Sequence, residues 1–238
     1  MKLIKWILNL FKSAPKTEPK QNQPVIPNDP IPNVKKLLTR EEYNQLNDLI
    51  FEAKVKVPPY TDYPYFTLRE TNGNNRSKGI DALITRQGGS LGDAYCQFGQ
   101  QDKMDAVALH LGIPRKMFNY PEGGGTQRVF NAVDPKYKTD TPKAACFVTV
   151  EYNNSGKGHI EDVREVVKIS GDGHTVKTRA FNTTIDGDDS IARDGAGAGF
   201  ATRTIKKEWV QGKDTVRLRG YVDHYAIYVD AFKKFYNV

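Results

Sequence analysis

The sequence lacks the features that mark several large classes of protein. It has no apolar run of eighteen residues or more, so no membrane-spanning helix is expected. Its two cysteines stand in very different local sequences, which argues against a disulfide framework. It shows no internal repeat. It has only four histidines, so any reaction that needs an imidazole has few candidates for it.

Positive charge is present in excess, and most of it lies at one end of the chain. The formal net charge is +7, but residues 1–36 hold seven lysines against Glu18 and Asp29, which leaves the other 202 residues near +2. Such an excess favours anionic partners. Basic and aromatic residues are not interleaved in one strand or helix, so no nucleic-acid partner is expected.

Residues 1–12 form a cationic amphipathic pattern. At helical spacing, three lysines and Asn9 share one face, and the opposite face is apolar: Leu3, Ile4, Ile7, Leu8 and Phe11. A short helix of this kind lies in a bilayer interface, so we expect an arm that binds an anionic membrane surface. The alternatives are a helix packed on its own domain and a truncated signal peptide. The interruption at Lys5, with no small-residue cleavage site after it, disfavours a signal peptide.

Six prolines among polar residues predict an extended linker over residues 13–36, followed by one folded domain over 37–238. The domain begins with helices. A capping box at Thr39-Arg-Glu-Glu42 opens the first helix, and a second, short helix is expected around 80–86. The third starts after Asp93 as N-cap, presents one apolar face, and stops at Gly112.

Residues 119–128, which hold three consecutive glycines, are expected to be a flexible loop. From Lys143 onward, β-rich segments alternate with glycine-marked turns, which predicts antiparallel strands and a closing helix. The expected strands are 144–152, 159–169, 175–184, 200–205 and 216–222, and the closing helix is 225–236. The fold class expected is therefore α+β, with N-terminal helices packed on an antiparallel sheet, as a monomer.

Cys96, in Gly92-Asp-Ala-Tyr-Cys96, is the first candidate for a nucleophile. It falls in the first turn of the third helix. The unpaired N–H groups and partial positive charge there lower the pKa of a thiol toward the reactive thiolate. Cys146 lies in the apolar run Ala-Ala-Cys-Phe-Val-Thr-Val and is expected to be a core residue.

A thiolate nucleophile needs a base that takes its proton and later returns it to the leaving group. His159 directly follows a glycine-rich turn and opens a strand, where an imidazole can project into a cleft. His110 lies about 21 Å from Cys96 along the same helix, which is too far. His174, in a hairpin turn, is expected to be solvated, and His224 stays open as an alternative.

Four segments of residues 65–205 carry a resemblance to a known family. In order they are Glu70 to Asp81, Gly92-Asp-Ala-Tyr-Cys96, Lys157-Gly-His159-Ile, and Thr175 to Thr183 with the glycine turn that begins at Gly195. A cysteine at a helix start, Gly-His at a strand start and a polar residue on the next strand follow the papain-like order. The sequence of these segments resembles that of the CHAP amidase/peptidase family of bacteriophage and bacterial peptidoglycan hydrolases.

The resemblance implies that Cys96 is the nucleophile, that His159 is the general base and acid, and that Asn182 orients the imidazole. A competing register gives this last role to Asp186. The family commonly has a glutamate two residues before the asparagine, where this chain has Ala180, so one acidic partner is missing. The backbone N–H of Cys96 is expected to belong to the oxyanion hole.

The implied activity is hydrolysis of an amide bond of bacterial peptidoglycan, as an amidase or an endopeptidase, through an acyl-enzyme on Cys96. Such a lysin is made in the host cytoplasm and acts on the cell wall, released at lysis or carried in a virion. The alternative is a catalytically silent cell-envelope-binding module with the same fold, which Ala180 favours. No cofactor is expected. The alternative is a calcium site at Asp186, Asp188, Asp189 and Ser190, which is disfavoured because the loop glycine and the bidentate glutamate of a calcium loop are missing.

Overall fold

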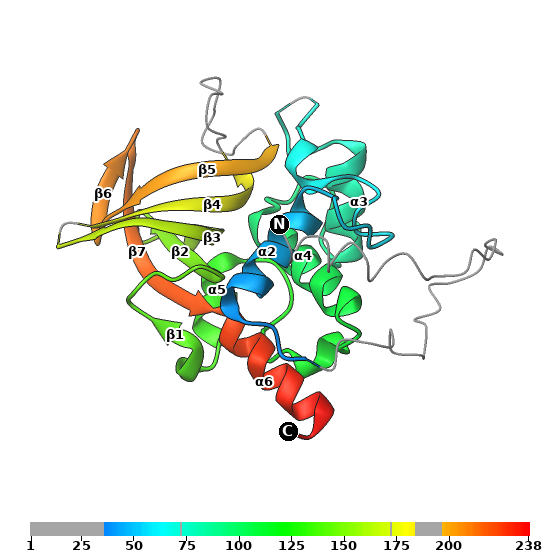
Figure 1. Ribbon diagram of the computed structural model, residues 1–238. Helices are drawn as coiled ribbons and strands as arrows, with labels where there is room; N and C mark the ends of the chain where they lie inside the picture. The colour runs from blue at the N-terminus through cyan, green and yellow to red at the C-terminus, as the bar shows by residue number, and fades with distance from the viewer. Residues whose placement is uncertain (1–35, 72, 172, 184–196) are drawn as a thin grey trace.

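A computed structural model of the chain describes most of its residues: 36–71, 73–171, 173–183 and 197–238. The expected amphipathic arm, the linker up to residue 35 and the acidic run around Asp186 lie outside the described residues. The described part is α+β, with five α-helices and an open antiparallel sheet of seven strands. Strands gather on one side and most of the helices on the other (Figure 1).

The five helices include one that the sequence analysis did not predict. They are α2 (Arg40–Phe51), α3 (Lys78–Arg86), α4 (Cys96–His110), α5 (Thr126–Ala132) and α6 (His224–Tyr236). The capping box at Thr39 is confirmed: its hydroxyl accepts from the N–H of Glu42, and the Glu42 carboxylate accepts from the N–H of Thr39. The expected loop over 119–128 is wrong at its end, because Gly125 adopts a left-handed φ of 85° and the chain turns there into α5.

The strands are β1 (Lys138–Thr139), β2 (Cys146–Tyr152), β3 (Lys157–Ser170), β4 (Gly173–Thr183), β5 (Gly197–Ile205), β6 (Glu208–Gln211) and β7 (Asp214–Asp223). Their order is β1-β7-β2-β3-β4-β5, and β6 pairs with β7. The short strands β1 and β6 were not predicted. β5 begins three residues earlier than expected, because Gly197 bridges to Arg69 so closely that a Cβ would collide with the carbonyl oxygen of Leu68.

The register of β3 places its side chains relative to its two neighbours. On one edge, His159 pairs with Val150 of β2. On the other edge, the pairing with β4 begins only at Glu161, opposite Ala180. Among the described strands, the first four residues of β3 therefore pair with β2 alone. Because side chains alternate along a strand, Glu161 shares a face with His159, and Asp162 points to the opposite face.

A large core fills the space between the helices and one face of the sheet, and a small apolar cluster lies on the other face. The central helix α4 is buried nearly all round, polar residues such as Gln100 and Lys103 included. The prediction of a single apolar face for this helix is therefore wrong. At Gly99 the helix comes so close to β4 that a Cβ would overlap the ring of Phe181. No described helix combines the length and the apolar character needed to cross a bilayer.

Candidate active site

Cys96 is the first residue of α4, and only 5% of it is exposed. Tyr95 holds the N-cap position and makes no side-chain capping bond. The prediction of Asp93 as N-cap is wrong, because its carboxylate instead accepts the N–H of Ser90 (2.8 Å) and closes the preceding loop. The first N–H groups of a helix have no intrahelical partner, so the thiol lies at the positive end of α4.

His159 is the third residue of β3 and lies beside the Cys96 thiol. Its Nε2 is 3.2 Å from Oε1 of Glu161, which leaves Nδ1 as the ring nitrogen available to the sulfur. Close packing requires a glycine before His159. A Cβ at Gly158 would collide with the carbonyl oxygen of Val150 and the side chain of Gln127. The glycine therefore lets β3 and α5 come close enough for the imidazole to reach Cys96.

Glu161 is the third member of the constellation, and the sequence analysis missed it. Its carboxylate is buried and accepts from Thr178 Oγ1 (2.5 Å), Thr183 Oγ1 (3.0 Å) and Arg203 Nε (3.0 Å) besides facing His159. It lies opposite Ala180 in the β3–β4 register, so the neighbouring strand supplies the carboxylate that is missing at Ala180. The available signal was the spacing His-x-Glu, which puts both side chains on one face of a strand.

The charges of these three groups stabilise one another. Burial raises the pKa of the Cys96 thiol, but the hydrogen bond and charge of His159 outweigh burial, and the net pKa is lowered. Burial lowers the pKa of His159, but its interactions with Cys96 and Glu161 raise it to about 9. Burial also raises the pKa of Glu161, but Arg203 and His159 hold it well below the ordinary range. The imidazolium therefore favours the thiolate, and the thiolate and the carboxylate favour the imidazolium.

A short helix, α5, supports the sulfur from another side. The hydroxyl of its first residue, Thr126, lies 3.6 Å from Sγ of Cys96. The next side chain, Gln127, donates from Nε2 to the carbonyl oxygen of Val150 (2.7 Å) on β2. The helix that the sequence analysis did not predict thus fixes the thiol relative to the strand next to β3.

Asn182 lies close to this constellation, near the end of β4. It is 7% exposed, has a left-handed φ of 51°, and lines the same cavity as His159 and Glu161. Its side-chain oxygen is buried and has no hydrogen-bond partner among the residues that the structure describes. Since Nε2 of His159 faces Glu161, orientation of the imidazole by Asn182 stays a prediction. The alternative orienter, Asp186, lies outside the described residues.

The other histidines and the second cysteine lie elsewhere. His174 is half-buried and its Nδ1 lies 2.9 Å from the hydroxyl of Tyr221, so the expectation of a solvated side chain is wrong. Burial lowers the pKa of His110, at the far end of α4, to about 4. Cys146 is a core residue, as predicted, and burial raises its pKa to about 12.

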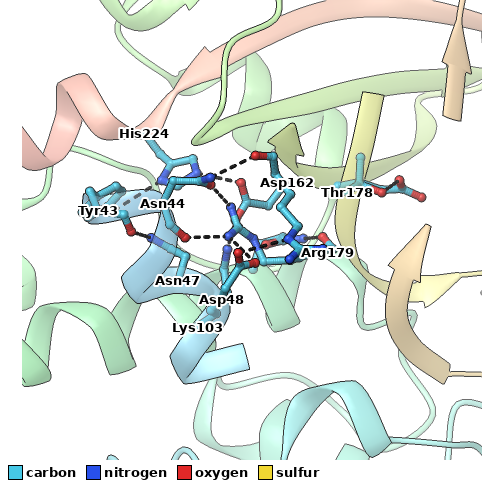
Figure 2. Close-up of polar contacts among 12 residues, drawn as sticks. Tyr43, Asn44, Asn47, Asp48, Lys103, Asp162, Thr178, Arg179 and His224 are labelled. Atoms are coloured by element: carbon cyan, nitrogen blue, oxygen red, sulfur yellow. Dashed lines mark hydrogen bonds and ion pairs between the residues drawn. The ribbon is translucent and has the colours of Figure 1, made fainter. Parts of the chain in front are cut away.

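His224 belongs to a second buried cluster, which joins the helices to the sheet (Figure 2). Its centre is Asp162, which pairs with His224 Nε2 (2.9 Å), with Arg179 Nε (2.9 Å) and with Lys103 Nζ. Arg179 also donates to Asp48 (3.0 Å) and to the backbone and side chain of Asn44 on α2. This Asp162 cluster connects α4, α2 and α6 to β3 and β4.

A cavity of about 450 Å³ lies on the face of the sheet that carries the small apolar cluster. Its lining includes His159, Glu161 and Asn182 and residues of the β6–β7 hairpin. The volume is in the range of small-molecule and peptide subsites. Among the residues that the structure describes, no three His, Cys, Asp or Glu side chains group in a way that could hold a metal ion.

No family model, curated protein or solved structure matches the chain. The functional interpretation of this site therefore depends on the geometry of Cys96, His159 and Glu161 and on the sequence motifs around them.

Proposed function

We propose that the chain is a cysteine-dependent amidohydrolase in which Cys96 is the nucleophile and His159 the general base and acid. Glu161 is the positioning residue that holds the imidazole. One observation carries this proposal: a thiol at a helix start has its pKa lowered by an imidazole, and that imidazole in turn faces a buried carboxylate. A nucleophile, a base and a third group that orients the base are the parts that covalent catalysis requires.

The reaction follows from these groups. The thiolate of Cys96 attacks the amide carbonyl carbon, and the N–H of Cys96 at the helix start stabilises the negative oxygen. The imidazolium of His159 gives its proton to the leaving amine as the C–N bond breaks, which leaves a thioester. Neutral His159 then takes a proton from water, whose oxygen attacks the thioester. The carboxylic acid product leaves, and the thiolate and imidazolium form again.

The substrate class that we propose is an amide bond of bacterial peptidoglycan. The four motifs that resemble the CHAP family support it, as does a cationic N-terminal segment suited to an anionic envelope. Residues 37–238 would then be one papain-like hydrolase domain, and residues 1–12 a membrane-surface arm. Glu161 weakens the alternative of a silent envelope-binding module, because the carboxylate missing at Ala180 is supplied by β3.

The test is loss of turbidity of purified peptidoglycan with the wild type, Cys96→Ala and Cys146→Ala, with mass spectrometry of the released fragments. We expect the wild type and Cys146→Ala to clear walls at rates within about twofold of each other, and Cys96→Ala to be slower by at least about 10³-fold. The masses of the fragments identify the bond that is cut.

Alkylation provides a readout that does not depend on the choice of cell wall. Iodoacetamide at pH 7 should modify Cys96 much faster than Cys146, because only the former has a lowered pKa. Equal rates, or clearing by Cys96→Ala, would contradict the catalytic assignment. Binding to walls from several hosts without clearing by any variant would favour the silent module.

A further inference from the structure

The cavity beside His159 has an apolar floor and an aromatic wall. Val148, Val150 and Ile205 come from three positions on β2 and β5 and are buried beneath it. Trp209 of β6 packs partly buried against the small apolar cluster and forms a wall. Aliphatic branches below and one indole at the side suit a ligand with methyl and methylene groups.

The two acidic side chains that line this cavity, Glu161 and Asp214, are already engaged in hydrogen bonds. Glu161 receives its four partners, one of which is Arg203. Asp214 accepts from Nδ2 of Asn153 at 2.5 Å. The two carboxylates therefore have little capacity left for a ligand, which disfavours the dense hydrogen bonding that a sugar ring requires.

Two groups at the cavity are suited to a ligand. The side-chain oxygen of Asn182 is buried and has no hydrogen-bond partner within the described part of the chain, and a buried acceptor left in this state is unfavourable. The terminal torsion of an asparagine is soft, so its amide can turn toward an N–H donor in the cavity. At the rim, Lys213 is an exposed cation in the β6–β7 turn.

We propose that this cavity binds the peptide part of the substrate next to the scissile bond, as an acidic peptide. Its amide N–H donates to Asn182, its aliphatic groups lie on the valine and isoleucine floor beside Trp209, and its carboxylate pairs with Lys213. The inference rests on the proposed function and assigns the substrate side of it. It gives Asn182 a role in binding rather than in orientation of His159.

The tryptophan content of the chain makes a direct test feasible. The sequence has two tryptophans, Trp6 and Trp209, so a Trp6→Phe background reports Trp209 alone. With Cys96→Ala added, binding is measured without hydrolysis. Three probes are titrated against full-length protein: N-acetyl-L-alanyl-D-isoglutamyl-L-lysyl-D-alanine, its isoglutaminyl form without the isoglutamyl carboxylate, and a tetramer of N-acetylglucosamine.

We expect the acidic peptide to shift the Trp209 emission and to saturate, and the amidated peptide to bind about fivefold to tenfold more weakly. The sugar tetramer should leave the emission unchanged. Equal binding of the two peptides would overturn the role of Lys213. Saturation by the sugar tetramer instead, or no response to any probe, would overturn the assignment of the cavity to peptide.

Variants assign the contacts, measured by calorimetry in the Cys96→Ala background. Lys213→Gln should weaken the acidic peptide about fivefold and leave the amidated one unchanged. Asn182→Gly, which suits the left-handed φ, should weaken both peptides about fivefold to tenfold, whereas Asn182→Asp keeps an oxygen acceptor. Val210→Ala is the matched control, since its side chain is 74% exposed beside Trp209, and it should change nothing.

The two proposals fail separately. If the wild type clears peptidoglycan but no peptide binds the cavity, this inference fails and the hydrolase remains. If the acidic peptide binds as expected while no cell wall is cleared, the subsite stands and the hydrolase proposal fails.

Discussion

Glu161 and Asp162 are neighbours on β3, and their side chains serve opposite faces of the same sheet. Each is a buried carboxylate that faces a histidine and an arginine. The Glu161 side keeps some access to solvent, since His159 and Arg203 have side chains that are 14% and 23% exposed. Around Asp162, the side chains of Lys103, Arg179 and His224 are at most 1% exposed.

The two histidines show what this difference does. The pKa of His159 rises to about 9 because, against burial, it faces both a thiol that ionises and a carboxylate. The pKa of His224 is lowered by burial, and Lys103 and Arg179 add to that effect while they compete for the same Asp162. The balance of charge around a buried imidazole, rather than its burial alone, decides whether it serves as a proton donor or as a neutral hydrogen-bond partner.

The largest effect is expected on stability at the Asp162 cluster. Asp162→Asn leaves Lys103 buried without its ion-pair partner and leaves Arg179 with Asp48 alone, so we expect the free energy of unfolding to fall by about 3–5 kcal/mol. Urea denaturation at pH 7 measures it. The control is Asp230→Asn, which breaks the exposed pair with Lys136 and should change stability by less than about 1 kcal/mol. Similar values for the two variants would remove the distinction between the clusters.

The next effect is on activity at Glu161. Glu161→Gln keeps the shape but loses the charge that stabilises the imidazolium, so kcat/KM should fall about 10²–10³-fold. The alkylation profile of Cys96 should also move to higher pH, because a less basic His159 lowers the thiol pKa less. Glu165→Gln, which changes an exposed glutamate of the same strand, is the control and should leave both readouts unchanged. An unshifted alkylation profile in Glu161→Gln would exclude the positioning role.

The smallest effect is a difference in response to alkaline pH. Burial lowers the pKa of Lys103 to about 8, below the value of about 10.4 in unfolded chains. The unfolded state thus binds more protons between these values, and the Lys103 contribution to stability rises with pH there.

The pKa of His159 is raised from about 6.5 to about 9, so its contribution to stability is complete below the unfolded pKa and is lost as pH rises through about 9.

Activity should therefore fall above about pH 9, where the imidazolium loses its proton. The Lys103 contribution should appear as a difference from Lys103→Met, whose free energy of unfolding lacks that rise between about pH 8 and pH 10. Parallel curves for the wild type and Lys103→Met would show that Lys103 does not titrate in this range.

Local sequence patterns predicted much of the fold. The capping box at Thr39, the glycine turns between the long strands and the final helix could all be predicted, because each depends on residues within a few positions. The two short strands and the seven-residue helix α5 were missed, since so few residues leave no clear periodicity. The burial of polar residues on all sides of α4 was not predicted, because partners such as Asp162 for Lys103 lie far away in sequence.

The pairing of Cys96 with His159 could be proposed from sequence because helix starts and Gly-His turns have local signatures. The role of Glu161 depends on which face of β3 looks toward the cavity, and only strand alternation from His159 hinted at it. The Asp162 cluster could not be foreseen, since Lys103 and Asp162 are 59 residues apart and meet only when α4 packs on the sheet.

Gly99 lies three residues after Cys96, where α4 touches the ring of Phe181. Because Gly99 has no side chain, α4 packs directly against this ring, and that contact sets the distance between the helix and the sheet. A methyl group at this position would push the helix outward. The distance from the sulfur of Cys96 to the imidazole of His159 would then increase, although neither side chain is changed. The smallest residue of α4 thus determines where the thiol of Cys96 lies relative to the imidazole of His159.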